Sequence, residues 1–170
     1  FTDAKLKLLF DVALKESTSL KKKYAVKGSF YSYADVAFDI ISKNKIFNAT
    51  TFLICGTGML ARKLIKKIVR RAPLKVFVAS RTKNKVDTIS KEFKINAVDW
   101  THLKDIYPKV DVILTCLATR NKLIREEDLS EVKEATLILD LGAPKNTEEM
   151  IKNKKKVRLY DMDDLNLEIV

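Results

Sequence analysis

Two spacings of apolar residues divide the chain into a helical beginning and a strand-rich remainder. Apolar side chains recur every three or four positions from residue 3 to about residue 22 and again after Gly28-Ser29, which predicts two amphipathic helices. At the start of the second helix, Ser32 with Asp35 three residues later resembles a capping box. From Asn48 onward, short apolar runs alternate with charged amphipathic stretches, a rhythm typical of βαβ units with a parallel sheet.

The alternating region predicts six strands and five intervening helices. The strands are expected near residues 51–55, 75–79, 96–98, 111–116, 137–141 and 157–160. The helices are expected near residues 59–71, 83–93, 101–107, 126–134 and 147–153. All three prolines fall between these elements, where a missing backbone N–H does no harm. The predicted fold is an α/β, Rossmann-type doubly wound parallel sheet of about six strands, preceded by two helices.

Two of the four glycines lie in one turn, between the first predicted strand and the helix that follows it. The segment is Gly56-Thr57-Gly58-Met59-Leu60-Ala61. It fits the G-x-G-x-x-G/A pattern, in which the first glycine permits a tight turn, the second lets the backbone approach a pyrophosphate, and a small last residue permits close helix packing. Free N–H groups at the helix N-terminus would face the phosphates. The alternative is a Rossmann fold that has lost its ligand.

The end of the second predicted strand indicates which dinucleotide would bind. NAD sites usually offer an acidic residue there to the ribose 2′-hydroxyl, but residues 75–85 contain no carboxylate. Basic and hydroxyl side chains stand there instead, and they can bind a 2′-phosphate. They are Ser80, Arg81, Thr82, Lys83 and Lys85. NADPH is therefore predicted over NADH, unless Arg81 only caps the following turn.

The turns after the fourth and fifth predicted strands should border the nicotinamide half of the cofactor. We expect Leu117, Ala118 and Gly142 to line it, with Gly142 small enough to leave room for a ring. No Ser/His/Asp set, carboxylate pair or nucleophile stands beside them, so no catalytic residue is assigned. Cys55 and Cys116 are predicted to be core residues. A single histidine without clustered carboxylates argues against a metal site.

The chain is strongly basic, with a formal net charge of +11, and should attract anions. Six basic residues decorate the helix after the glycine turn: Arg62, Lys63, Lys66, Lys67, Arg70 and Arg71. This face could contact RNA phosphates, but such faces are more often solvated and it lacks interleaved aromatic side chains. A basic nucleic-acid or regulatory module stays an alternative function.

Length and composition limit the organisation of the chain. With 170 residues, 46% of them hydrophobic, it can bury one medium-sized core. We expect a helical lead-in over residues 1–46, an NADP-binding domain over 47–161 and the start of a linker over 162–170. The chain lacks a membrane-length apolar run, so a cytoplasmic protein is expected. The first residue is Phe1 rather than Met, which keeps open that the chain is a piece of a longer protein.

These segments together resemble glutamyl-tRNA reductase, the NADPH-dependent enzyme that opens the five-carbon route to tetrapyrroles. The resemblance covers nearly the whole chain. The helical lead-in resembles the family's spinal helix and its entry into the NADPH domain. The glycine turn is similar to the family's G-x-G-x-M-A/G-type loop, and Ser80-Arg81-Thr82 is similar to its Asn-Arg-Thr. Asp140 to Pro144 resembles an Asp-x-x-x-Pro segment. The most specific match is Leu159-Tyr160-Asp161-Met162-Asp163-Asp164-Leu165. Departures are Ser80 in place of Asn, Lys145 in place of Arg, and a shifted small residue within 116–119.

The resemblance implies a catalytic cysteine that attacks glutamyl-tRNA and a thioester that NADPH reduces to glutamate 1-semialdehyde. That cysteine belongs to a Ser-x-Cys-Asn-Arg-type motif, which does not occur in this sequence, so neither cysteine here inherits the role. The resemblance also implies a full-length homodimer formed through a carboxyl-terminal domain. Other NADP-dependent oxidoreductases, similar to shikimate dehydrogenase or siroheme synthase, stay alternatives because they also pair a glycine-rich turn with a Rossmann sheet.

Overall fold

The computed structural model describes residues 3–23 and 32–168, which fall into two units divided between Phe30 and Tyr31. The first unit contains the predicted first helix, α1 (Asp3–Lys23), on which Leu6, Leu9 and Phe10 are exposed. The Gly28-Ser29 segment lies outside the described residues. Within the described ranges, no helix is both long enough and apolar enough to span a membrane.

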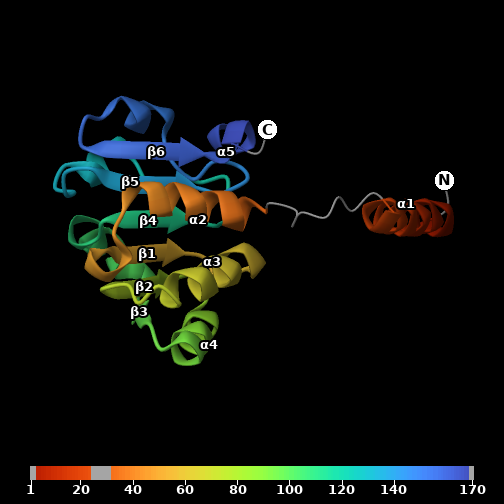
Figure 1. Ribbon diagram of the computed structural model, residues 1–170, viewed down its shortest axis with the longest axis horizontal. Helices are drawn as coiled ribbons and strands as arrows, with labels where there is room; N and C mark the ends of the chain where they lie inside the picture. Colours follow the sequence, from red (N-terminus) through yellow and green to blue (C-terminus); the bar gives the residue numbers. More distant parts are fainter. Residues whose placement is uncertain (1–2, 24–31, 169–170) are drawn as a thin grey trace. The chain divides into compact units, whose positions relative to one another are not determined.

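Six parallel strands form one sheet in the order β3-β2-β1-β4-β5-β6 (Figure 1). They are β1 (Thr51–Cys55), β2 (Lys75–Ala79), β3 (Asn96–Val98), β4 (Val112–Thr115), β5 (Thr136–Asp140) and β6 (Val157–Asp161). The chain runs outward from β1 to β3, returns to β4 beside β1 and continues to β6. This is a doubly wound sheet, so the predicted fold class is confirmed. The order reverses between β1 and β4, where such sheets bind ligands outside the carboxyl ends of their strands.

Different kinds of element cover the two faces of the sheet. One face packs against α2 (Tyr33–Asn44), α3 (Met59–Val69) and α4 (Lys83–Phe93), and α2 and α3 lie across the strands in Figure 1. The other face packs against short 3-10 segments. They are η2 (Trp100–His102), η3 (Lys104–Lys109), η4 (Glu126–Leu129) and η5 (Glu149–Asn153). Because side chains alternate along a strand, Phe52 and Ile54 enter the first core while Leu53 and Cys55 enter the second.

The α-helices predicted over residues 101–107, 126–134 and 147–153 are wrong, because 3-10 segments and turns occupy these crossovers. Each short segment buries few apolar side chains, such as Leu129 in η4 and Ile151 in η5, so it has no long stripe to pack. Pro108 lies inside η3, where its missing N–H prevents regular helical hydrogen bonding. The predicted strands agree with the observed ones to within one residue at each end.

Two elements extend the compact unit beyond the expected boundaries at residues 47 and 161. Helix α2 belongs to it because Val36, Ile40 and Ile41 are buried in the core. Where a linker was expected, α5 (Met162–Glu168) begins, and its Leu165 is fully buried. The short 3-10 segment η1 (Phe47–Ala49) joins α2 to β1.

The capping box predicted at α2 is present and connects α2 to α3. Oδ2 of Asp35 accepts a hydrogen bond from the Ser32 N–H at 2.9 Å, while Oδ1 lies 2.6 Å from Nζ of Lys67 on α3. The hydrogen bond from Lys67 and those from Ser32 lower the pKa of Asp35 from 3.8 to about 2. A carboxyl whose pKa is lower in the folded chain stabilises the fold above its unfolded pKa and loses that contribution in acid.

We expect Asp35→Asn to lower the free energy of unfolding by about 1 kcal/mol at pH 7, less than the full pKa shift implies because the side chains are partly exposed. The difference from the original chain should shrink as the pH falls from about 4 to about 2. Urea denaturation across this pH range measures it. Glu131→Gln, at an exposed position, is the control. An Asp35→Asn difference that is the same at pH 7 and pH 2.5 would contradict the assignment.

Candidate functional site

The turn after β1 requires its first glycine because of both its backbone conformation and its surroundings. Gly56 has φ = +130°, a region that residues with side chains rarely adopt. A Cβ at this position would lie 2.7 Å from the carbonyl oxygen of Cys116, in the turn after β4. The Gly56 N–H donates to the Ala79 carbonyl at 2.8 Å. The turn is therefore held tightly between the ends of β2 and β4, which is the geometry expected of the first glycine in the pattern.

The second glycine leaves open space where a ligand could approach the backbone. No heavy atom lies within 4 Å of a Cβ built at Gly58, which caps α3 in an extended conformation. The first N–H groups of α3 have no partner within the helix and begin at this point. Met59 beside it is exposed, Leu60 packs against the core and Ala61 is fully buried. This arrangement fits a dinucleotide pyrophosphate, although the binding role of these residues stays a prediction.

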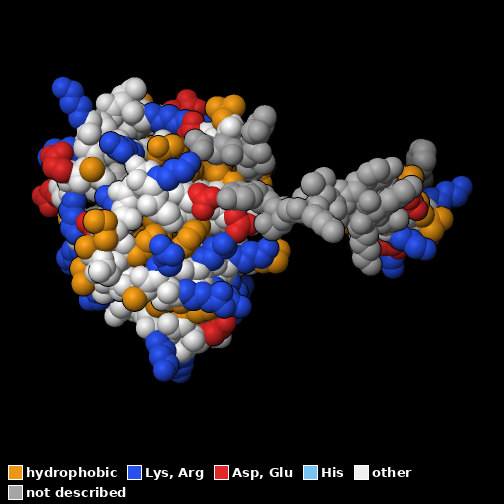
Figure 2. Space-filling model, in the orientation of Figure 1, with side chains coloured by type: hydrophobic (Ala, Val, Ile, Leu, Met, Phe, Trp, Pro, Cys, Tyr) orange, Lys and Arg blue, Asp and Glu red, His pale blue; other side chains and the backbone are white. Residues whose placement is uncertain are grey.

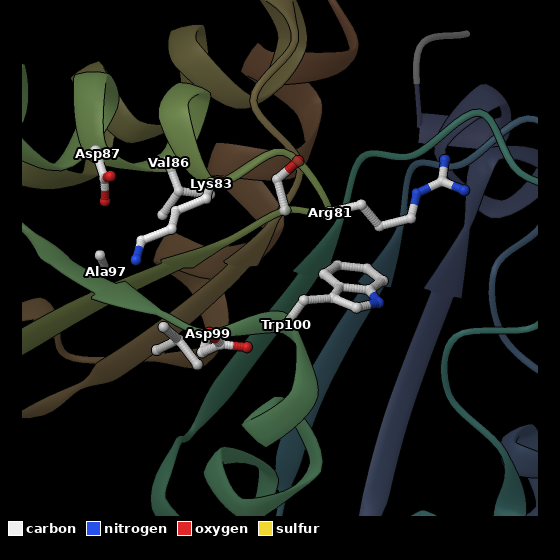
Figure 3. A pocket seen from close by; sticks show the side chains of 9 residues that line it. Arg81, Lys83, Val86, Asp87, Ala97, Asp99 and Trp100 are labelled. Carbon is white, nitrogen blue, oxygen red and sulfur yellow. The ribbon is translucent and has the colours of Figure 1, made fainter.

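Arg81 extends from the end of β2 between two hollows. The first has a volume of about 290 Å³ (Figure 3). Its lining residues include Ser80, Arg81, Lys83, Asp87, Asp99 and Trp100. Figure 3 shows Arg81 and Trp100 on one side of the hollow, with Lys83 and Asp87 reaching in from α4. The second hollow, of about 360 Å³, shares Arg81 and Trp100 with the first and also contacts Leu117.

The guanidinium of Arg81 makes no hydrogen bond or salt bridge to any residue in the described parts of the chain. The alternative that Arg81 caps the following turn therefore lacks support, because α4 begins after Thr82 without a side-chain cap. Exposed and unpaired, Arg81 is available to an anionic ligand. Lys85 lies apart from it, in a third hollow that it shares with Thr57 and Arg62 beside the glycine turn. Ala118 is exposed and lines none of these three hollows.

The carboxyl ends of β4 and β5 are joined by the buried carboxylate of Asp140. It accepts five hydrogen bonds and has no exposed surface. The donors are Thr115 Oγ1 at 2.7 Å, Gly142 N at 3.0 Å, Asn146 N at 2.6 Å, and Thr147 N and Oγ1, both at 2.8 Å. A buried carboxylate is tolerated when its oxygens are satisfied in this way. Asp140 therefore fixes the backbone that would border a nicotinamide ring.

Gly142 does not leave room for a ring, contrary to the prediction from its size. A Cβ at Gly142 would lie 2.3 Å from Oδ1 of Asn146, so the Asn146 side chain already fills that space. Asn146 is itself buried; its Oδ1 accepts a hydrogen bond from the Leu117 N–H at 3.3 Å and its Nδ2 donates to the Pro144 carbonyl at 3.1 Å. Gly142 thus permits close packing between the turns after β4 and β5.

The two thiols are unsuited to nucleophilic attack. Burial raises the pKa of the Cys55 thiol well above its ordinary value, and the neighbouring Cys116 adds to the shift. Burial and then the charge of Asp140 raise the pKa of Cys116 to about 12. Because the thiolate is the reactive form, neither cysteine supplies a nucleophile at neutral pH. Both are free thiols, and among the described residues no cluster of three or more ligand side chains could hold a metal ion.

The acidic segment after β6 is connected to the turn after β5. Oδ2 of Asp161 lies 3.0 Å from Nζ of both Lys145 and Lys152, and Oδ1 accepts N–H hydrogen bonds from Asp163 and Asp164 at the start of α5. Burial alone would raise the pKa of Asp161, but the two lysine hydrogen bonds lower it below its usual value. Lys145, where the resembled family commonly has Arg, therefore pairs with Asp161 of the Leu-Tyr-Asp segment.

Sequence reasoning missed Asn146, Asp99 and Trp100 as residues of this site. A signal for the last two was present, because Asp99 and the only tryptophan follow directly after the third predicted strand. Asn146 offered no comparable signal, since its hydrogen bond to Leu117 reaches a turn 29 residues away in the sequence.

The sheet, its reversal between β1 and β4 and the glycine turn define the class of domain. It is an NAD(P)-binding domain of the Rossmann type, whose ligand is a nicotinamide dinucleotide. The chain belongs to the shikimate / quinate 5-dehydrogenase family, whose model matches residues 39–168.

Individual relatives add a more specific likeness. The glutamyl-tRNA reductase of Clostridium novyi is 28% identical over 166 residues, covering 96% of this chain and 40% of the relative. Among solved structures, glutamyl-tRNA reductase from Methanopyrus kandleri has a TM-score of 0.74 at 23% identity, over 98% of this chain and 43% of that one. The nucleotide binding domain of glutamyl-tRNA reductase from Thermoplasma volcanium has a TM-score of 0.64 at 24% identity, over 81% of this chain and 91% of that one. The two structures support the fold, and the chain spans about two fifths of the Clostridium relative.

The packing of Gly142 against Asn146 predicts a coupled effect on stability. We expect Gly142→Ala to lower the free energy of unfolding by about 1–3 kcal/mol, because the added methyl group collides with the Asn146 amide. In an Asn146→Ala background the same methyl group should cost clearly less, since the amide is absent while the backbone N–H to Asp140 is kept. Urea denaturation of the four proteins gives the coupling energy.

Gly58→Ala is the matched control for this cycle, because its methyl group would meet open space. It should change the free energy of unfolding by less than about 1 kcal/mol. An equal cost of Gly142→Ala in both backgrounds would show that Asn146 is not what excludes the side chain.

Proposed function

We propose that this chain is the NADPH-binding domain of a glutamyl-tRNA reductase, a cytoplasmic enzyme of tetrapyrrole biosynthesis. The observation that carries the cofactor assignment is the unpaired Arg81 at the end of β2, beside a glycine turn with open space at Gly58. When bound, NADPH supplies the hydride that reduces the thioester of the glutamyl group to glutamate 1-semialdehyde. The residues of this chain bind and orient that hydride donor.

The charges around Arg81 support NADPH over NADH. An NAD site usually has a carboxylate at the end of β2, and here Ser80-Arg81-Thr82 occupies that position. A guanidinium suits a phosphate dianion because it is planar, always charged and rich in N–H donors. The two carboxylates that line the first hollow with Arg81, Asp87 and Asp99, come from α4 and from the end of β3. Neither stands where the ribose 2′-hydroxyl is usually bound.

The relatives favour glutamyl-tRNA reductase over the shikimate dehydrogenase alternative. The family model covers residues 39–168, whereas the match to the Clostridium glutamyl-tRNA reductase covers 96% of the chain and therefore also part of the lead-in before residue 39. A glutamyl-tRNA substrate and a homodimer formed through a further domain accompany this proposal. The nucleophile that forms the thioester must come from outside this chain, because the raised pKa values of Cys55 and Cys116 make both thiols unreactive.

The basic face of α3 gives little support to the alternative of a nucleic-acid module. Figure 2 shows Lys and Arg side chains gathered over α3 and α4. Several of them are already engaged, since Arg62 pairs with Glu92, Lys67 pairs with Asp35, and Arg71 lies 5.5 Å from the Phe47 ring centroid. Charges engaged in packing are less available to RNA phosphates than a free basic strip would be.

We expect Arg81→Ala to weaken NADPH binding by about ten- to a hundred-fold, since one charge-assisted contact to the 2′-phosphate is lost. NADH binding should change by less than about threefold, because NADH has no phosphate at that position. Isothermal titration calorimetry with both dinucleotides measures the preference. Lys91→Ala, at an exposed position on α4, is the control for a general loss of positive charge. Equal affinity of the original chain for NADPH and NADH would overturn the cofactor assignment.

We also expect the chain alone to bind NADPH without consuming it. In the presence of glutamyl-tRNA, the absorbance of NADPH should stay constant, because neither thiol of this chain is reactive at neutral pH. Stopped-flow or steady-state spectrophotometry tests this. Consumption that depends on glutamyl-tRNA and is lost in Cys116→Ser would place the nucleophile in this chain and refute the proposed division of roles.

A further inference from the structure

Positive charge accumulates at the edge of the sheet where the strands begin. Because all six strands are parallel, the residues before each strand share this edge, which lies opposite the edge with the glycine turn. The three residues before each strand and its first residue define what we call the amino edge, and they include seven lysines and two carboxylates. The lysines are Lys75, Lys94, Lys109, Lys133, Lys154, Lys155 and Lys156, and the carboxylates are Asp111 and Glu134.

Four lysines of the amino edge have no carboxylate partner in the described parts of the chain. The other three are paired, Lys133 with Asp111, Lys154 with Glu126 and Lys156 with Glu134. The four without a carboxylate are Lys75, Lys94, Lys109 and Lys155, and all of them are exposed. They stand at the starts of β2, β3, β4 and β6, so they are spread over about 24 Å, at about 4.8 Å per strand. A row of this length can contact several anionic groups at once.

Two large aliphatic side chains are exposed beside these charges. Ile46 is 74% exposed and Leu74 is 65% exposed. Their backbone segments are joined, because the Leu74 N–H donates to the carbonyl oxygens of Phe47 at 3.2 Å and Thr50 at 3.1 Å. Basic and hydrophobic side chains lie together on the left of Figure 2, where the strands of Figure 1 begin. A single exposed aliphatic residue is ordinary, but here two share a surface with unpaired cations.

The combination of unpaired cations and exposed aliphatic side chains favours a lipid surface over a nucleic acid. A nucleic-acid backbone supplies phosphates but no apolar surface for Ile46 and Leu74, and single strands bind by stacking on aromatic side chains. Phe93, the one aromatic residue in the ranges that define the amino edge, is partly buried against the core. An anionic bilayer offers charged headgroups at its surface and hydrocarbon directly beneath them, so it matches both features.

We propose that the amino edge docks on a membrane surface rich in anionic lipids. The four unpaired lysines contact the headgroups, and Ile46 and Leu74 enter the boundary between the headgroups and the acyl chains. This inference goes beyond the proposed function, because the dinucleotide belongs to the opposite ends of the strands, about 16 Å away for a strand of five residues. The two surfaces can therefore be occupied at the same time.

Co-sedimentation with vesicles tests the charges of this surface. The original chain should bind vesicles that contain about 30% phosphatidylglycerol at least tenfold more tightly than vesicles of phosphatidylcholine alone. Lys109→Gln combined with Lys155→Gln should weaken binding to the anionic vesicles by about tenfold. Lys63→Gln combined with Arg120→Gln removes the same charge at exposed positions on α3 and after β4. This matched control should weaken binding by less than about threefold, because its charges lie away from the amino edge.

A second pair of variants tests the aliphatic side chains. Ile46→Ser combined with Leu74→Ser keeps every charge and should weaken binding to the anionic vesicles by about tenfold, because less apolar surface enters the membrane. Met150→Ser combined with Leu167→Ser changes exposed apolar residues on η5 and α5 and is the matched control. Helix α1 also exposes apolar side chains, but it is the same in every variant, so the differences report the amino edge. Thermal unfolding of each variant checks that the fold is kept.

The outcomes separate this inference from the proposed function. Equal binding to neutral and anionic vesicles, or equal effects of the amino-edge variants and their controls, would overturn the docking surface. A loss of binding in the lysine variant without any loss in the Ile46 and Leu74 variant would indicate a general polyanion site, such as one for RNA, and would also overturn it. NADPH affinity should be the same in all these variants. Vesicle binding by a chain that does not bind NADPH would refute the proposed function alone.

Discussion

The buried carboxylate of Asp140 is the interaction on which the ligand-facing edge of the sheet depends. Its two oxygens gather donors from β4 and from the turn after β5, so a single side chain sets how those segments meet. Loss of the carboxylate would leave several buried donors without a partner, which costs more than the net value of any one hydrogen bond. The close packing of Gly142 on Asn146 accompanies this placement, and the charge of Asp140 adds to the effect of burial in raising the pKa of Cys116.

The sheet was predictable because its central strands are buried on both faces and are therefore continuous apolar runs, as in residues 51–55. Helices α3 and α4 were predictable because each carries a stripe long enough to show its period. The 3-10 segments on the opposite face of the sheet were not predictable, because a crossover that buries only one or two side chains shows no periodic spacing of apolar residues. α5 was missed although Asp161 and Asp164 have the spacing of a capping box, and in the structure the backbone N–H of each donates to the carboxylate of the other.

The features of the candidate site that could be predicted depend on residues close together in the sequence, and those that could not depend on residues far apart in it. The conformation of Gly56 and the burial of Ala61 follow from one continuous motif, and the sequence predicted both. The position of Lys85, apart from Arg81, and the filling of space beside Gly142 depend on elements that meet only in the folded chain. A small residue leaves free space for a ligand only if no neighbouring side chain fills the space beside it. At Gly142, Asn146 is that neighbour, and the prediction of space for a ring was wrong for this reason.

The two ends of the site differ in whether their charged side chains are paired within the fold. At the β2 and β3 end, Arg81 and Oδ2 of Asp99 have no partner in the described chain, so these charges are available to a ligand. At the β4 and β5 end, Asp140 is saturated and Lys145 is paired with Asp161 and Asp163, so the charges are used within the fold. Unpaired charge can recognise a phosphate or a base, whereas saturated charge only holds backbone in place. The unpaired charges therefore support the proposed binding of a dinucleotide at the β2 and β3 end, whereas the saturated charges keep the backbone at the β4 and β5 end rigid.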